Sequence, residues 1–196
     1  MNRRESLKLV AAAPFAAGFT WTPTDVAHAH DKQQALSTAA EPFAAEFFTD
    51  HEFETVRVLV ALIIPADDRS GSATDAGVPE FMDFMMMDRP AMQNPMRGGL
   101  AWLDHQCRKR FSTTFVECDD AQRRALLDDI AWPDVAPPEM SQGAAFFNSF
   151  RDLTASGFWS SQMGVDDLQY MGNTFVREWT GCPQEVLDRL GVSYGD

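Results

Sequence analysis

The sequence predicts a single compact all-α domain of about five to seven helices behind an N-terminal export signal. Apolar residues recur at helical spacing behind capping residues, Pro and Gly separate these segments, and no alternating β-pattern persists. The length of 196 residues and the apolar content of 45% suit one folded domain with a buried core. We divide the chain into a signal at 1–29, a linker at 30–48 and a helical domain at 49–196.

The first 29 residues have the features of a twin-arginine export signal. Arg3 and Arg4 precede a short apolar stretch, which is far below the ~20 residues of a membrane span. Ala27 and Ala29 form an A-x-A cleavage motif, so we place cleavage of the signal after Ala29. The alternative is an amphipathic helix that stays on the protein. Export would involve the twin-arginine (Tat) translocase, which carries folded proteins, and would end in the periplasm.

The first helix of the domain is predicted to follow Thr49. Residues 30–48 are rich in Ala, Gln and small polar groups and have no apolar period, which indicates a linker. Thr49 and Glu52 have capping-box spacing ahead of an apolar run. That run is nearly continuous and stops at Pro65, so we expect a helix buried on most sides.

Pro79 suits the first turn of a second helix, and a third helix is expected over 96–111. A fourth should start at Asp119, because Gln122 stands three residues later.

Two further helices are expected in the last third of the chain. Ser141 is the predicted cap of a fifth helix, which we expect to end near Gly157. A short sixth helix should begin around Pro183 and close at Gly191.

The charge and the missing motifs exclude several functions. The formal net charge of −13 argues against nucleic acid as a partner, because phosphates repel such a chain. The sequence has no Gly-rich phosphate loop, no haem-attachment motif and no set of four cysteines for an iron–sulfur cluster. His51 and His105 lack a second ligand at metal spacing and suit a surface or an N-cap. We therefore expect no catalytic, cofactor-binding or metal-ligating residue in this chain.

Two side-chain groups leave an alternative open. A dense methionine cluster suits a packed helix with an adaptable contact surface, or else a Cu(I) site. It comprises Met82, Met85, Met86, Met87, Met92 and Met96. Trp102, Trp132 and Trp159 would line the sugar-sized pocket of a stand-alone binding protein. An acidic loop at 67–75 fails the EF-hand spacing and indicates solvated carboxylates.

Three cysteines are disulfide candidates in an oxidising compartment. Cys107 and Cys118 are eleven residues apart, a workable span between the end of one helix and the start of the next. Cys182 would then be left over, which suggests an intermolecular bridge or a free thiol. A shuffled pairing and three buried reduced thiols are the alternatives.

Several segments together resemble the gluconate 2-dehydrogenase subunit 3 family, over residues 47 to about 185. They lie in the expected order at 47–49, 62–68, 75–81, 98–104, 146–154, 157–161, 164–173 and 181–183. The family consists of small subunits of periplasmic flavin-dependent sugar and sugar-acid dehydrogenases.

The resemblance implies an accessory role. A large FAD-containing subunit of the glucose-methanol-choline (GMC) type would do the chemistry and pass electrons to a cytochrome c subunit or acceptor, which carries haem c. The small subunit would supply the export signal for both, reach a membrane only through the complex, and offer Cys182 as a candidate bridge. We expect aromatic and Met residues to bury against the large subunit. The candidates are Phe84, Met85, Met86, Met87, Phe158, Trp159 and Tyr170, the last three being equally suited to the domain's own core.

Overall fold

A computed structural model describes residues 43–170, 177–178 and 181–194. Within these ranges the chain forms α-helices and short 3-10 helices and no strand, which confirms the all-α prediction. The elements are α3 (Asp50–Ile63), α4 (Val78–Asp88), η1 (Pro90–Met92), α5 (Gln93–Phe111), α6 (Asp120–Asp128), η2 (Pro138–Met140), α7 (Ser141–Ser160), α8 (Gln162–Leu168) and α9 (Gln184–Leu190). The predicted signal, with Arg3, Arg4, Ala27 and Ala29, lies outside the described residues.

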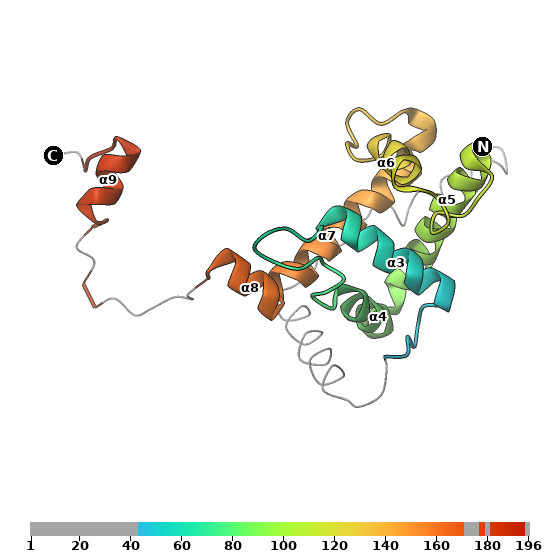
Figure 1. The fold of residues 1–196 in the computed structure, drawn as a ribbon, viewed down its shortest axis with the longest axis horizontal. Coiled ribbons are helices and arrows are strands. Elements are labelled where there is room, and N and C mark those ends of the chain that lie inside the picture. The colour runs from blue at the N-terminus through green and yellow to red at the C-terminus, as the bar shows by residue number, and fades with distance from the viewer. Residues whose placement is uncertain (1–42, 171–176, 179–180, 195–196) are drawn as a thin grey trace.

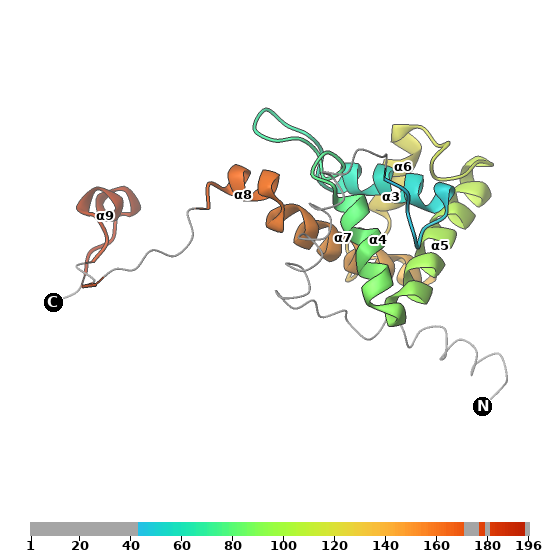
Figure 2. The same ribbon diagram turned by 90° about the horizontal axis from the view of Figure 1, so that it is seen from below.

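The longest helix, α7, lies at the centre of the bundle. It contacts α3, α4 and α5, and α8 packs against its C-terminal end (Figure 1). Seen from below, α9 again lies apart from the other helices, as it does in the first view (Figure 2).

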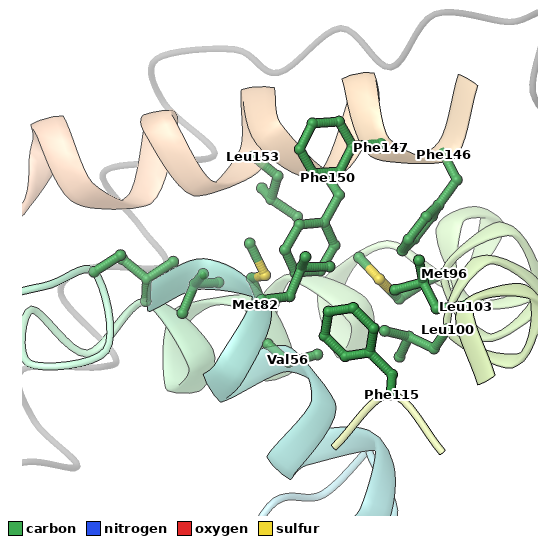
Figure 3. Packing of buried hydrophobic residues seen from close by; sticks show 14 of the residues in the cluster. Val56, Met82, Met96, Leu100, Leu103, Phe115, Phe146, Phe147, Phe150 and Leu153 are labelled. Carbon is green, nitrogen blue, oxygen red and sulfur yellow. The ribbon is translucent and has the colours of Figure 1, made fainter. Parts of the chain in front are cut away.

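Apolar side chains of α3, α4, α5 and α7 meet in one core. Figure 3 shows α7 and α5 directing side chains toward one another, with residues of α3, α4 and the loop after α5 between them. These include Phe146, Phe150 and Leu153 of α7, Met96, Leu100 and Leu103 of α5, and Val56, Met82 and Phe115. Full burial of such a side chain contributes about 1.5–3 kcal/mol, so this cluster is what holds the bundle together.

Two predicted helix starts are confirmed in atomic detail. Thr49 accepts a hydrogen bond from the Glu52 N–H, and the Glu52 side chain accepts one from the Thr49 N–H. Asp119 and Gln122 form the same reciprocal box at α6. Each box satisfies two N–H groups that a helix start otherwise leaves unpaired.

The predicted ends of the fifth helix were wrong. Ser141 is the first residue of α7 rather than its cap, because the 3-10 turn η2 leads straight into the helix. The helix also continues past Gly157 to Ser160. Gly157 is needed there for close packing, since a Cβ would lie 2.9 Å from the ring of Phe81. The short helix α8 that follows, capped by Ser161, was not predicted.

The start of the domain at Thr49 was also placed too late. Phe47 and Phe48 are buried in the core. Asp83 of α4, itself buried, accepts hydrogen bonds from the N–H groups of Glu46 (2.8 Å), Phe47 (3.1 Å) and Phe48 (3.0 Å). Arg97 donates to the Phe47 carbonyl at 2.7 Å. The stretch 46–48 is therefore anchored to the bundle and is not a free linker.

Candidate functional site

A polar hollow of about 250 Å³ lies between α3 and α5. Its central group is the buried carboxylate of Asp104. Asp104 Oδ2 lies 2.7 Å from His51 Nε2 and 3.1 Å from Arg108 Nη2, and Oδ1 accepts the Phe115 N–H at 2.9 Å. A carboxylate only accepts, so Nε2 carries the hydrogen of this contact.

Three donors therefore already occupy the Asp104 carboxylate. It connects α3, α5 and the loop after α5, and it is not a free base poised beside a nucleophile. The sequence suggested a surface or cap position for His51 and gave no sign of this contact, because 53 residues separate it from Asp104. Both histidines are exposed as expected, and 49% of the His51 side chain is accessible.

The methionine cluster belongs to the hydrophobic core. Met82, Met85 and Met86 are fully buried, and Met92 and Met96 are nearly so. They pack among aliphatic and aromatic side chains, which supports the packing interpretation over a copper site. Only Met87 of the six is exposed, at 44%. In the described part of the chain, no three His, Cys, Asp or Glu residues gather as a metal site would require.

The carboxylates of the acidic loop hold the loop itself. Asp67 accepts the N–H groups of Arg69 and Ser70, and these bonds hold the pKa of Asp67 below its usual range. Asp75 accepts from the hydroxyl and N–H of Ser72, which lowers its pKa likewise. The hydrogen bonds give these acids a structural role in shaping the loop.

The tryptophans do not line one pocket. Trp102 packs beside Gly143, where a Cβ would lie 2.2 Å from its ring, near the start of α7. Trp159 stands near the other end of the same helix, sixteen residues on, or roughly 24 Å at 1.5 Å per residue. Trp132 is 67% exposed in the loop after α6. A sugar-sized pocket cannot use both Trp102 and Trp159.

The interface candidates divide between core and surface. Met85, Met86 and Phe158 are fully buried within the chain. The interface placement of Met85 and Met86 is therefore corrected, and Phe158 takes its alternative place in the domain's own core. Phe84 is half-buried. Trp159 and Tyr170 are 40% and 61% exposed, as an interface role requires.

Three exposed apolar residues lie in the stretch from the end of α7 to just after α8. They are Trp159, Leu168 and Tyr170, here called the α7–α8 apolar set. Leu168 is 56% exposed and was not predicted from the sequence as an interface residue. Its position at the end of the unpredicted helix α8 explains the omission.

The fold holds α8 firmly against α7. A Cβ on Gly164 would lie 2.0 Å from the Phe158 carbonyl oxygen, so only glycine permits this approach. Arg69, from the loop before α4, pairs with the Asp167 carboxylate at 3.0 Å and also donates to the Asp167 carbonyl. The α7–α8 apolar set is therefore presented on a braced element.

The cysteines are in two environments. Cys107 and Cys118 are buried and Cys182 is exposed, and all three are reduced. The Cys182 N–H donates to the Tyr194 hydroxyl at 2.7 Å, which closes the C-terminal segment 181–194 on itself.

These features define a small all-α domain whose buried carboxylates brace its own backbone and whose large apolar side chains are partly exposed at one edge. The chain matches the family model described as gluconate 2-dehydrogenase subunit 3 over residues 50–177, and it belongs to that family. Neither the curated proteins nor the solved structures contain a match to it. Among the described helices, none combines the length and apolar character needed to cross a membrane.

Proposed function

We propose that this chain is the non-catalytic small subunit of a periplasmic flavin-dependent dehydrogenase for glucosides, glucose, gluconate or similar sugars and sugar acids. It supplies the twin-arginine signal that exports the folded catalytic subunit, and it stabilises that subunit through a large interface. The observation that carries this proposal is membership of the subunit 3 family over α3 to α8. The large GMC-type subunit holds FAD, and electrons pass on to a cytochrome c.

The α7–α8 apolar set supports a docking surface at one edge of the bundle. Aromatic side chains are enriched where stable interfaces exclude water, and Trp159 and Tyr170 supply two of them. Because α8 is braced by Gly164 and Arg69, these side chains lose little freedom on binding.

The C-terminal segment 181–194 gives a second reason to expect a partner. Its helix α9 has seven residues, which is too short to be stable alone in water. Its exposed apolar residues are Val186, Leu190, Val192 and Tyr194. Burial of this segment on the large subunit would stabilise it, and exposed Cys182 is placed where a bridge to that subunit could form.

The test is affinity purification of the tagged full chain from periplasm, with the co-purifying protein scanned for flavin absorbance. We expect a large flavoprotein whose periplasmic level falls when Arg3 and Arg4 are both changed to Lys. Non-reducing and reducing gels show whether the two subunits separate only on reduction, and Cys182→Ser should then abolish that link.

A matched control changes Arg57 and Arg124, two exposed arginines of the domain, to Lys and should leave export intact. A stable, colourless monomer in the periplasm with no partner would contradict the subunit proposal. Export that is unaffected by the change at Arg3 and Arg4 would contradict the escort role.

A further inference from the structure

Two buried thiols face each other where α5 ends and α6 begins. Cys107 lies on the core side of α5 and is fully buried, and Cys118 directly precedes the α6 cap and is 3% exposed. A hydrogen bond joins their side chains. The two side chains therefore lie near each other in the reduced, folded chain.

The loop between them is held in place by contacts that do not involve sulfur. Phe115 is buried, its N–H donates to Asp104, and its carbonyl accepts from Arg123 Nε at 3.0 Å. The Cys118 N–H donates to the Thr114 carbonyl at 3.0 Å. These bonds hold the loop that carries Cys118 against α5, the helix that carries Cys107.

We infer that Cys107 and Cys118 form an intrachain disulfide once the folded chain reaches an oxidising compartment, and that Cys182 stays outside this pair. The inference rests on the periplasmic location in the proposed function. The bundle packs both thiols without the bond, so the chain can fold reduced before export. The helix α9, which follows Cys182 closely, lies apart from α5 and α6 in both views (Figures 1 and 2).

The oxidant is the disulfide of a thiol oxidoreductase or a small disulfide compound such as oxidised glutathione. The Cys118 thiolate attacks one oxidant sulfur and releases the other as a thiol. The Cys107 sulfur then attacks Cys118 in the mixed disulfide and releases the second thiol. The cysteine pair loses two electrons and two protons, and the oxidant disulfide becomes two thiols.

The two sulfurs differ slightly in exposure. Burial, together with the hydrogen bond to Cys118, raises the pKa of the Cys107 thiol to about 12. The thiolate is the nucleophile, so burial slows attack by Cys107 on an oxidant. Cys118 keeps 3% exposure where Cys107 has none, and it is the residue that we expect to form the mixed disulfide.

The test counts free thiols in the full chain purified from periplasm. The protein is denatured in a maleimide before and after reduction, and its peptides are identified by mass. We expect neither Cys107 nor Cys118 to be free before reduction and both to be free after it, with a linked Cys107–Cys118 peptide. Cys182→Ser should leave no free thiol before reduction, and Cys107→Ser should expose Cys118.

A second arm does not depend on export. The reduced full chain, with Arg3 and Arg4 changed to Lys so that it stays in the cytoplasm, is purified and treated with oxidised glutathione. The same linked peptide should form, and Cys107→Ser should instead trap glutathione on Cys118. Free Cys107 and Cys118 in both arms, or a disulfide that joins Cys182 to either of them, would overturn the inference. If the disulfide forms in the second arm but no chain reaches the periplasm in the first, only the export proposal is refuted.

Discussion

Replacing Asp83 with Ala should detach the segment 46–48 from the bundle. The Asp83 carboxylate is 3% exposed and accepts three backbone N–H groups, two of which, from Phe47 and Phe48, are buried. Alanine offers these donors no acceptor. Each buried donor left unsatisfied costs about 1–3 kcal/mol, so the two together should lower the free energy of unfolding by about 2–6 kcal/mol.

A second variant checks the geometry of this estimate. In Asp83→Asn, the remaining oxygen can still accept the N–H groups of Phe47 and Phe48, which both contact Oδ1. The new amide nitrogen faces the Glu46 N–H, which contacts Oδ2, so one bond is lost. We expect a loss of about 1–2 kcal/mol, well below that of Asp83→Ala.

The assay is urea unfolding of the purified full chain followed by circular dichroism, together with hydrogen exchange of residues 46–48. A domain of ordinary stability unfolds with about 5–15 kcal/mol, so the effect of Asp83→Ala is large enough to measure. Asp88→Ala, an exposed acid on the same helix, is the control and should change little. An unchanged urea midpoint together with unchanged exchange at 46–48 would refute this reasoning.

Three further predictions test the core, the pH dependence and the interface. Gly99→Ala should destabilise the chain by 1–3 kcal/mol in urea unfolding, because its Cβ would lie 1.9 Å from the Phe146 ring; full stability would contradict the close α5–α7 approach. Burial raises the pKa of Glu80 above its ordinary 4.5, so its contribution to stability is lost as pH rises through that raised pKa. Glu80→Gln should therefore be more stable than the wild type at pH 7 and equal to it below pH 4.5, and a constant difference would contradict this. Tyr170→Ser should weaken flavoprotein binding about 5–30-fold, whereas Trp132→Ser, similarly exposed, should not; equal effects would contradict docking at α8.

The parts of the fold that the sequence predicted correctly depend on local chemistry. The capping boxes at Thr49 and Asp119 involve residues three apart, so their spacing can be recognised in the sequence. The end of α7 depends instead on packing between helices. Gly157 would ordinarily favour a stop, but its contact with Phe81 of α4 makes it a packing residue inside the helix.

The interface residues were harder to predict from the sequence, because their exposure also depends on packing between helices. Apolar residues such as Met85 and Phe158 suit a core and an interface equally, and only the direction in which each helix face points separates the two. That direction is set by how α4 and α7 pack, which composition does not reveal. Trp159 and Phe158 are neighbours in sequence, yet one is 40% exposed and the other 1%.

The two buried carboxylates brace the chain itself. Burial of a charged group is unfavourable unless its hydrogen-bond capacity is used, and Asp83 and Asp104 each accept three donors. Asp83 holds the N-terminal segment and Asp104 holds the loop that carries Cys118. Each carboxylate thus fixes a segment that leads to a proposed role, the export signal on one side and the disulfide on the other. A change at either should therefore alter assembly or stability of the complex, while the turnover of each assembled flavoprotein stays the same.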